Sequence, residues 1–313
     1  MDKRRKKILV TGGAGFIGSH ITELLCDKGY TVAVVDDLRF GYRSFVDKRA
    51  KFFRIAIEDS EAIEKALAGV DVVMHLASSS IITFSYEHPI EYFENNLLNG
   101  IKLLEAMRKK GVGKIIYSST SSVYGEPKKV PIKEDNPTNP LNAYAASKLA
   151  FEQALISYYH SFGIESVSLR YYNAYGPRDE QKPRTRAVPM WIEAILENKP
   201  IPWHWQGRQV RDYIYVKDVA QAHFDVLNLK GIYCFNIGSG KGVVMKDVLK
   251  TLEKIVGRKL KTQDLGERKG DPMKSFADIS KIKTAVGWIP KVTLEDGLRE
   301  TFEYYKNKKH END

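Results

Sequence analysis

Two stretches of the sequence place side chains where they could move a proton. SSTSSVYG, residues 118–125, gathers hydroxyl groups after an apolar segment, and YAASK, residues 144–148, sets Tyr144 four residues before Lys148. On a helix these two side chains would share one face. A neighbouring cation lowers the pKa of a phenol, which ordinarily lies near about 10, so Tyr144 could accept a proton near neutral pH. The alternatives are a serine-rich loop and a chance pair on an exposed helix.

A third stretch, TGGAGFIGSH at residues 11–20, could bind a dinucleotide. It has the spacing G-x-G-x-x-G between an expected strand and an expected helix. Glycines let the backbone approach a diphosphate, which then rests on the helix N-terminus. Asp36 ends the next apolar segment, where its carboxylate can bind the ribose hydroxyls of NAD and repel the extra phosphate of NADP, and Asp37 strengthens that preference. The alternative is a tight turn followed by a helix-capping Asp.

The elements around these stretches alternate between strand and helix. Helical spacing of apolar residues predicts helices over 16–28, 60–68, 90–110 and 143–162. Short runs rich in Val and Ile predict strands over 6–12, 31–36, 50–56, 70–77, 112–119 and 164–173. This alternation predicts an α/β fold built on a Rossmann-type, doubly wound parallel sheet.

After residue 173 the pattern becomes irregular and rich in proline. We therefore expect residues 1–173 to form an NAD-binding domain that carries the proton-moving residues. Residues 174–313 are expected to form mostly a smaller C-terminal α/β substrate domain, although the segments around 211–240 could return to the first domain. The smaller domain would cover the C-terminal edge of the sheet, where such sheets bind ligands.

The composition of the 313 residues, with 43% hydrophobic and 28% charged, is typical of a globular protein. No apolar run approaches the length of about 18 residues that can span a membrane. Only MDKRRKK precedes the first strand, which leaves no room for a signal peptide. Cys26 and Cys234 form no metal or redox pattern, so we expect a cytoplasmic protein without a metal site.

The net charge of +10 is spread along the chain rather than concentrated. A solvated lysine-rich surface is favoured over nucleic-acid binding, because the aromatic residues do not alternate with the charges. An anionic substrate would also be attracted by this charge.

The chain resembles the extended short-chain dehydrogenase/reductases, and within them the UDP-glucose 4-epimerase-like nucleotide-sugar enzymes. The resemblance covers essentially the whole chain and implies an NAD-dependent isomerase. Its motifs are TGGAGFIG (11–18), DDL (36–38), HLA (75–77), SSTSSVYG (118–125), YAASK (144–148), LRYYNAYGPR (169–178), RDYIYVKDVAQA (211–222), FNIGSG (235–240), RKGD (268–271) and GWIP (287–290).

The resemblance also assigns site residues. It makes Thr120, Tyr144 and Lys148 the catalytic set. It places NAD against Gly12, Gly15, Phe16, Ile17, Gly18, Asp36, Asp37, Ile57, Leu76, Ala77, Ser78, Asn96, Ser118, Tyr144, Lys148 and Tyr171. It places the UDP-sugar against Thr120, Tyr144, Asn173, Val188, Arg211, Arg268, Asp271 and Ser275.

The mechanism that the resemblance implies is epimerisation at C4. Tyr144 would take the proton of the sugar 4-hydroxyl while a hydride passes from C4 to NAD⁺, and Thr120 would hydrogen-bond the same oxygen. The 4-keto intermediate would rotate and receive the hydride on its other face, so NAD would stay bound between cycles. UDP-glucose and UDP-galactose are the expected pair of sugars.

Two serines distinguish this chain from relatives that eliminate water or carbon dioxide. Related 4,6-dehydratases carry Asp-Glu directly after the catalytic Thr, and related UDP-glucuronate decarboxylases carry a Glu two residues after it. Here those positions are Ser121 and Ser122. A hydroxyl of very high pKa cannot replace a carboxylic acid in an elimination. The sequence therefore favours epimerisation.

Several positions depart from the family pattern or are open to more than one interpretation. Ala56 stands where the family often has an Asp near the adenine, and Asp59 is expected to begin a helix instead. The aromatic turn 205–207, Trp-Gln-Gly, replaces Gly-Asp-Gly and could contact the uracil or only pack. Ser275 falls where some relatives have a bulky Tyr, so the pocket could accept an N-acetyl group. His75 is expected to be a buried structural histidine.

Other functions and an assembly follow from the same features. One alternative is a 4-epimerase for UDP-N-acetylglucosamine or UDP-glucuronate. A non-catalytic NAD-binding sensor is disfavoured because the proposed catalytic set is complete, and an RNA-binding relative would need a localised basic face. Helices 90–110 and 143–162 resemble those that pair across a two-fold axis in the family, so a homodimer is expected. Alternatively, their apolar faces are buried within one chain.

Overall fold

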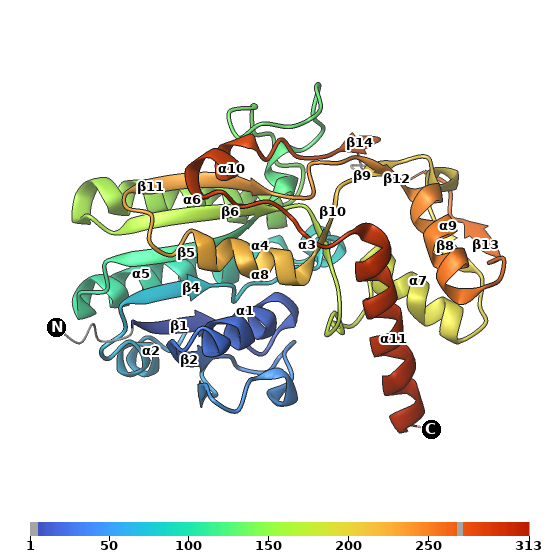
Figure 1. Ribbon diagram of the computed structural model, residues 1–313. Coiled ribbons are helices and arrows are strands. Elements are labelled where there is room, and N and C mark those ends of the chain that lie inside the picture. Colours follow the sequence, from blue (N-terminus) through green and yellow to red (C-terminus); the bar gives the residue numbers. More distant parts are fainter. Residues whose placement is uncertain (1–5, 268–271, 313) are drawn as a thin grey trace.

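A parallel sheet of seven strands forms the centre of the larger part of the structure (Figure 1), a computed structural model that describes residues 6–267 and 272–312. From edge to edge the strands are β11 (Ile232–Ile237), β6 (Glu165–Tyr171), β5 (Lys114–Thr120), β4 (Val72–His75), β1 (Lys7–Thr11), β2 (Thr31–Val35) and β3 (Lys51–Phe53). The strand order reverses between β1 and β4, and a crevice forms at the carboxyl ends of the strands at such a reversal. The predicted fold class is confirmed.

Helices cover both faces of this sheet because successive strand residues point in opposite directions. Ile8 and Val10 of β1 face one layer, and Leu9 faces the other. The first layer contains α1 (Phe16–Asp27), α8 (Val216–Asp225) and α10 (Ser280–Val286). The second layer contains α2 (Ser60–Ala66), α5 (Asn99–Lys110) and α6 (Ala143–Phe162).

The elements predicted in the first half of the chain are present, with one clear addition from the second half. Each predicted strand before residue 173 has its counterpart, while β11 pairs with β6 at the edge of the same sheet. Asp59 is the N-cap of α2, because its carboxylate accepts a 3.0 Å hydrogen bond from the backbone N–H of Ala62. The prediction that Asp59 begins a helix is therefore confirmed.

A π-helical turn interrupts the helix that was predicted over 90–110. α4 (Pro89–Phe93) leads into the turn Glu94–Leu98 and then into α5, and α3 (Ile82–Glu87) precedes them. Asn96 in this turn is buried; its amide oxygen accepts a bond from the N–H of Ser79 at 2.8 Å, and its nitrogen donates to the hydroxyl of Ser147 at 3.1 Å. The turn thus ties the segment after β4 to α6.

The smaller part of the structure packs around its own apolar core. Trp191, Leu252 and Phe302 belong to this core and come from three helices. These helices are α7 (Ala187–Leu196), α9 (Met245–Val256) and α11 (Leu294–Asn312). Short strands connect them, namely β7 (Asn173–Tyr175), β8 (Ile201–Trp203), β9 (Val210–Arg211), β10 (Tyr213–Tyr215), β12 (Val243–Val244), β13 (Thr262–Asp264) and β14 (Lys274–Ser275). The division of the chain into domains at residue 173 stays a prediction.

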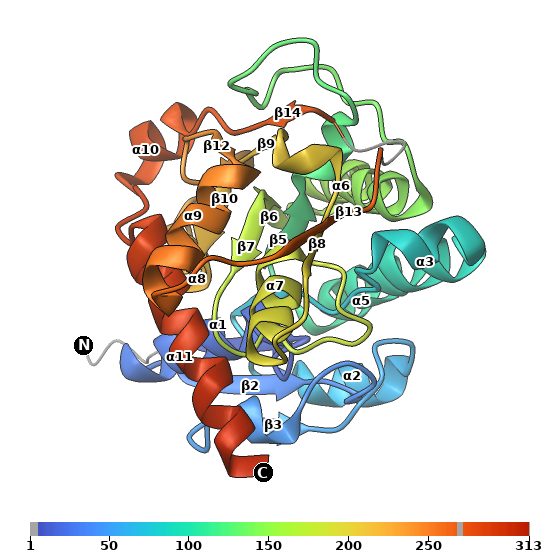
Figure 2. The same cartoon turned by 90° about the vertical axis from the view of Figure 1, so that its right-hand side faces the viewer.

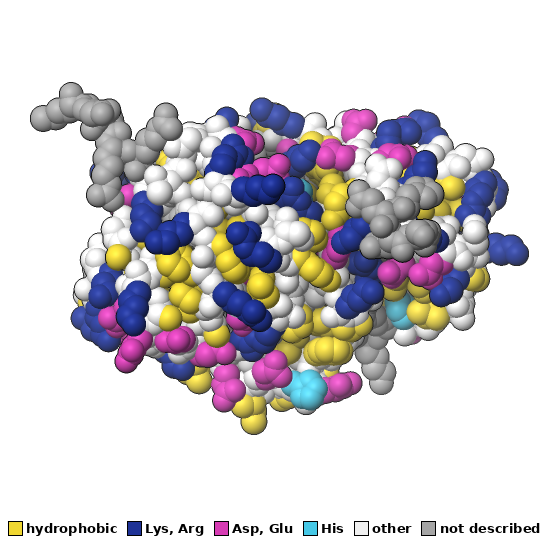
Figure 3. All heavy atoms as spheres, turned by 90° about the horizontal axis from the view of Figure 1, so that it is seen from below, with side chains coloured by type: hydrophobic (Ala, Val, Ile, Leu, Met, Phe, Trp, Pro, Cys, Tyr) yellow, Lys and Arg dark blue, Asp and Glu magenta, His cyan; other side chains and the backbone are white. Residues whose placement is uncertain are grey.

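The surface carries both charges and exposed apolar side chains. On the face shown in Figure 3, Lys and Arg are interspersed with Asp and Glu. Large exposed apolar side chains on α3, α4 and α6 are Phe84, Tyr86, Ile90, Phe93, Ile156 and Phe162. A homodimer formed through the predicted helices 90–110 and 143–162 stays a prediction. No helix within residues 6–267 and 272–312 is long and apolar enough to cross a membrane.

We predict that Gly100→Ala destabilises the fold. This is the reverse of the intrinsic preference, because alanine in a helix interior is usually more stable than glycine by up to about 1 kcal/mol. A Cβ at Gly100 of α5 would lie 2.6 Å from the ring of Phe151 on α6. Overpacking of this kind typically costs about 1–3 kcal/mol. The free energy of unfolding in urea should therefore fall. Gly113→Ala is the control, since its Cβ would meet no atom within 4 Å. A gain in stability for Gly100→Ala would contradict the close contact of the two helices.

Candidate active site

A cavity of about 530 Å³ lies where the smaller part of the structure faces the carboxyl ends of the sheet strands. In Figure 2, α7 and β8 of the smaller part lie in front of the sheet. Most of the residues expected from the sequence to bind cofactor or substrate line this one cavity. They are Gly12, Gly15, Phe16, Ile17, Gly18, Asp36, Asp37, Ile57, Leu76, Ala77, Ser78, Ser118, Thr120, Tyr144, Lys148, Tyr171, Asn173, Val188, Arg211 and Ser275.

The glycine-rich segment that joins β1 to α1 leaves no room for a Cβ at Gly12 or Gly18. A Cβ on Gly12 would lie 2.7 Å from the backbone nitrogen of Ala77, and one on Gly18 would lie 2.2 Å from the carbonyl oxygen of Gly12. No side chain caps α1, and its first turn holds no acidic residue. The backbone N–H groups of that turn are therefore available to an anion such as a diphosphate.

Asp36 is held at the end of β2 by two backbone donors. Its carboxylate accepts hydrogen bonds from the N–H of Ala14 at 3.0 Å and from the N–H of Leu38 at 2.9 Å. Burial raises the pKa of Asp36, and these two hydrogen bonds oppose the shift. Asp37 lies beside it and pairs with Arg39, with 2.5 Å between Oδ2 and Nε. The hydrogen bond from Ala14 fixes the Asp36 carboxylate against the glycine-rich loop. A dinucleotide ribose could reach the carboxylate in this position.

His75 at the end of β4 is structural, as its position in the sequence suggested. It is 1% exposed, and its Nδ1 lies 2.8 Å from the hydroxyl of Thr11. Burial lowers the pKa of His75 to about 3, so the imidazole is uncharged at neutral pH. The Thr11 hydroxyl also accepts a 3.3 Å bond from the N–H of Ala77. His75 therefore orients the cavity wall through Thr11.

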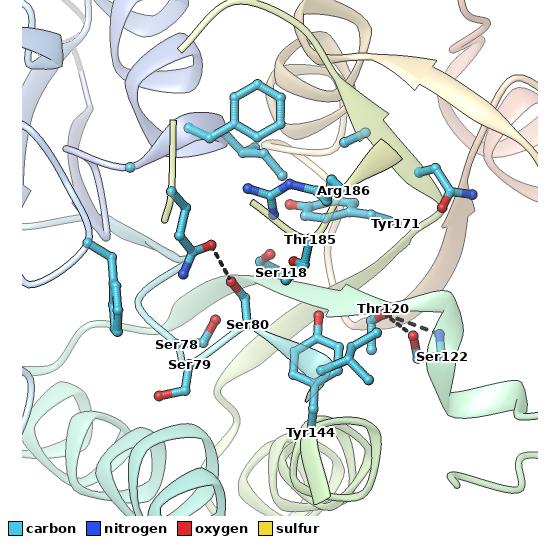
Figure 4. A pocket seen from close by; sticks show the side chains of 18 of the residues that line it. Ser78, Ser79, Ser80, Ser118, Thr120, Ser122, Tyr144, Tyr171, Thr185 and Arg186 are labelled. Carbon is cyan, nitrogen blue, oxygen red and sulfur yellow. Dashed lines mark hydrogen bonds between the residues drawn. The ribbon is translucent and has the colours of Figure 1, made fainter. Parts of the chain in front are cut away.

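Thr120 and Tyr144 meet at one wall of the cavity (Figure 4). Thr120 ends β5, and its hydroxyl accepts a 3.1 Å bond from the N–H of Ser122, which lies in a 3₁₀ turn over Ser121–Tyr124. Tyr144 stands in the first turn of α6, which Asn142 caps by accepting a bond from the N–H of Ala145 at 2.9 Å. Strand end and helix start thus bring the two hydroxyl groups together.

Burial raises the pKa of Tyr144 above its ordinary value. The hydrogen bond with Thr120 and the positive charge of Arg186 both oppose that rise. The sequence had suggested Lys148 as the cation that lowers this pKa, but the Lys148 ammonium points elsewhere. Its Nζ donates a 2.8 Å bond to the carbonyl of Ser118 and lies 4.9 Å from the centre of the Tyr117 ring.

Lys148 is itself strongly affected by burial. It is 2% exposed, and its pKa falls from 10.5 to about 7, with the negative charge of Glu152 opposing the fall. Glu152 lies one turn later on α6 and pairs with Arg170 of β6, with 2.6 Å between Oε2 and Nη2. Glu152 also accepts a hydrogen bond from the hydroxyl of Ser119. A buried network therefore connects α6 to both β5 and β6 beneath the cavity.

The residues expected to bind the sugar nucleotide gather on the side of the smaller part. Asn173 begins β7, and its side-chain nitrogen donates a 3.0 Å bond to the carbonyl of Asp212. Arg211 on β9 lies opposite Ser275 on β14, and Val188 lies in the first turn of α7. Arg268 and Asp271 lie outside the residues that the structure describes. Asn96, expected to contact the cofactor, instead lies in the buried π turn described above.

Several cavity residues were not found from the sequence. Thr185 and Arg186, which precede α7, face the cavity from the side opposite Tyr144 (Figure 4). Trp203 and His204 of the WHWQG segment also line the cavity. Arg186 lies in a short proline-rich stretch in which apolar residues show no helical or strand periodicity. Only the tertiary fold brings that residue to the glycine-rich loop.

We predict that Lys148 makes the stability of the cofactor-free protein depend on pH. A lysine of the unfolded chain holds its proton up to about pH 10.4, whereas folded Lys148 loses it near pH 7. Between these values the unfolded state binds more protons, so this group makes stability rise with pH. Urea unfolding at pH 7 and pH 9.5 should show a smaller rise for Lys148→Met than for the wild type. Lys65→Met, on the exposed side of α2, should keep the wild-type rise. Equal slopes in all three proteins would refute the buried, low-pKa lysine.

Known proteins share both the sequence and the architecture of this chain. Residues 8–238 match the NAD dependent epimerase/dehydratase family. A UDP-glucose 4-epimerase from Thermotoga maritima, solved with UDP-glucose, is 37% identical and superposes with a TM-score of 0.93, covering 96% of this chain and 99% of that one. A UDP-glucose 4-epimerase from Thermus thermophilus, solved with NAD, is 40% identical with a TM-score of 0.89 and the same coverage.

A neighbour that acts on another sugar is almost as similar. The UDP-N-acetylglucosamine 4-epimerase from Methanobrevibacter ruminantium M1, solved with UDP-N-acetylmuramic acid, is 33% identical with a TM-score of 0.92, covering 97% of this chain and 99% of that one. The family match includes the glycine-rich loop, the Tyr-x-x-x-Lys pair and the Arg-Asp segment at 211–212. The resemblance noted in the sequence is thus confirmed, and the chain belongs to the NAD dependent epimerase/dehydratase family.

Proposed function

We propose that this chain interconverts UDP-glucose and UDP-galactose by epimerisation at C4, with NAD as its cofactor. The observation that carries the proposal is the meeting of Thr120 and Tyr144 on a cavity wall whose next residues are Ser121 and Ser122. Such a wall offers hydroxyl groups that can accept and return one proton. It offers no carboxylic acid that could protonate a leaving group of the sugar.

The distribution of carboxylates around the cavity supports epimerisation rather than elimination. Among the described residues that line it, Asp36 and Asp37 are the only acidic ones, and both follow β2 beside the glycine-rich loop. An elimination needs a general acid or base within hydrogen-bond reach of the sugar. Asp36 and Asp37 lie at the cofactor end of the cavity, so they do not supply a general acid or base at the sugar.

The residues around β1 and α1 fit NAD. The cradle at Gly12 and Gly18 excludes any Cβ, the uncapped first turn of α1 suits a diphosphate, and Asp36 suits an unphosphorylated ribose. NAD, when bound, takes a hydride from C4 and returns it to the opposite face. Lys148 and Tyr171 then lie where they can hold the nicotinamide end, since both line the cavity beside Tyr144.

Tyr144 would act as the proton acceptor and donor, and Thr120 would hydrogen-bond the reacting oxygen. Because burial raises the pKa of Tyr144, its phenolate needs positive charge nearby. Arg186 supplies one such charge, and the oxidised cofactor carries another. Proton transfer is thereby restricted to the loaded site.

The sugar nucleotide would lie against the smaller part of the structure. Asn173, Val188 and Arg211 line the cavity there, together with Ser275. We propose that Asn173 and Arg211 contact the diphosphate and that Ser275 borders the sugar. Arg268 and Asp271 remain proposed nucleotide contacts on the strength of their motif alone.

UDP-N-acetylglucosamine is the second candidate substrate. Ser275 is small and faces the cavity, which leaves space for an N-acetyl group, and the Methanobrevibacter ruminantium neighbour is an epimerase of that sugar. UDP-glucuronate is a further alternative. UDP-glucuronate would place an additional negative charge in the cavity. Arg186 and Arg211, which both line the cavity, could form an ion pair with that charge.

A panel of UDP-hexoses tests the proposal directly. The purified protein is incubated with UDP-glucose, UDP-galactose, UDP-N-acetylglucosamine and UDP-glucuronate, and the products are resolved by proton NMR. UDP-glucose and UDP-galactose should interconvert fastest and reach the same mixture from either side. Faster turnover of another sugar would transfer the assignment to that sugar. A dehydrated or decarboxylated product would contradict the assignment of the hydroxyl wall.

We predict that Tyr144→Phe abolishes turnover while leaving UDP binding nearly unchanged. The substitution removes the hydroxyl that exchanges the proton, an effect worth about 10²–10⁴-fold in rate. The ring and its contact with Tyr92, at 6.4 Å between centroids, are retained. Turnover is measured with the preferred sugar, and UDP affinity by calorimetry. Tyr159→Phe, later on the same helix, is the control and should retain activity. Unchanged turnover in Tyr144→Phe would remove Tyr144 from the catalytic set.

A further inference from the structure

Residues 178–186 form a segment between β7 and α7 that borders the cavity and contains two buried acids. Asp179 is 2% exposed and Glu180 is 5% exposed. From the same segment Arg178, Gln181, Thr185 and Arg186 line the cavity. A buried carboxylate is costly unless it is paired. The partners of these two acids therefore determine how the segment lies over the cavity.

Asp179 is paired within the segment and sets the direction of Arg186. The Nε of Arg186 lies 3.0 Å from one carboxylate oxygen of Asp179 and 2.9 Å from the other, and Nη2 donates a further bond. Such a two-oxygen contact fixes the plane of the guanidinium group. The Arg186 side chain is still 38% exposed, so its remaining N–H groups can reach a ligand.

Arg186 is directed at the cofactor end of the cavity. Its guanidinium carbon lies 5.5 Å from the centre of the Phe16 ring, and Phe16 is the first residue of α1. The uncapped first turn of α1 and the Arg186 side chain both line this cavity. An anion placed there would receive bonds from both, and a diphosphate is long enough to do so.

Glu180 is paired by the last turns of α11, which is the end of the described chain. Tyr304 donates a 2.5 Å hydrogen bond to Oε1 of Glu180, and Lys308 forms an ion pair with Oε2. Tyr305 donates to the backbone carbonyl of Asp179. Both acids of the segment are therefore connected to one face of one helix.

Lys308 also reaches the loop after β2. Its Nζ lies 5.7 Å from the ring centres of both Tyr42 and Phe45, and the N–H of Tyr42 donates a 3.0 Å bond to the carbonyl of Ala14 in the glycine-rich loop. The helix thus joins the two segments that flank the cofactor end of the cavity.

We propose that Arg186 binds the diphosphate of NAD, and that α11 retains the cofactor by anchoring the segment that positions Arg186. The proposal rests on the NAD cofactor of the proposed function. Asp179, Glu180 and Tyr304 are positioning residues, whereas Arg186 touches the cofactor. The diphosphate of the sugar nucleotide could bind an arginine in the same way. We assign Arg186 to the cofactor because it contacts Phe16, at the cofactor end of the cavity.

The test measures cofactor release, which requires no turnover. Wild type, Arg186→Met, Tyr304→Phe and the control Lys306→Met are stripped of cofactor and loaded with NADH. Lys306 lies on the same helix and pairs with Glu303 of that helix, at 3.8 Å. An excess of NAD is then added, and the decay of NADH fluorescence gives the release rate. UDP affinity is measured by calorimetry on the same loaded proteins, and melting temperatures report folding.

We expect release to accelerate by about tenfold or more in Arg186→Met, since a lost charge-assisted bond is worth at least that factor. Tyr304→Phe should accelerate it by a smaller factor of about threefold to tenfold. Lys306→Met should match the wild type, and all four proteins should bind UDP alike.

Each contrary result has a distinct meaning. Unchanged release in Arg186→Met refutes the cofactor contact, and if UDP binding weakens instead, Arg186 belongs to the sugar nucleotide. Faster release in Arg186→Met but not in Tyr304→Phe refutes the anchoring by α11. Equal acceleration in Lys306→Met would also refute it. If no UDP-sugar is epimerised but release follows the expected order, the proposed substrate is wrong while the cofactor contact stands.

Discussion

The candidate active site depends on how α6 is fixed against the sheet, and the buried ion pair between Glu152 and Arg170 fixes it. A buried pair stabilises a fold only when each charge is fully hydrogen-bonded. Here Glu152 also binds Ser119, and Arg170 donates a 2.9 Å bond to the hydroxyl of Tyr124. Ser119 directly precedes Thr120, and Glu152 lies one turn after Lys148. The pair therefore holds α6, which carries Tyr144, against β5, which ends at Thr120.

Burial favours the uncharged form of both Tyr144 and Lys148. It raises the pKa of Tyr144, and it lowers the pKa of Lys148 to about 7. Positive charge near a buried tyrosine favours loss of its proton, and Arg186 already supplies part of that charge. Glu152 counteracts the loss of charge on Lys148, so one buried carboxylate serves both the packing of α6 and its electrostatics. Under the proposed function, the positive charge of the oxidised cofactor would favour the Tyr144 phenolate, so proton transfer would be coupled to a loaded site.

Local patterns in the sequence predicted the parts of the site that are themselves local. The glycine spacing, the acids after β2 and the Tyr-x-x-x-Lys pair each lie within one element or one turn, and the alternation of strands and helices places them at one sheet edge. Asn96 and Arg186 could not be placed in this way. Asn96 depends on a π-helical turn that apolar periodicity does not reveal. Arg186 pairs with Asp179, in a segment that α11 contacts from more than a hundred residues later in the chain. Tertiary pairing, rather than propensity, decides where both side chains lie.

A cofactor that is restored at the end of each cycle has no need to leave its site. In many enzymes that release a ligand at every turnover, the opening of a covering segment limits the rate. A self-restoring cycle removes that limit, so a tightly anchored cover carries no penalty in rate. The buried acids of residues 178–186 and their partners on α11 form such an anchor. The C-terminal helix holds none of the proposed catalytic groups, yet it belongs to the site through the segment it fastens.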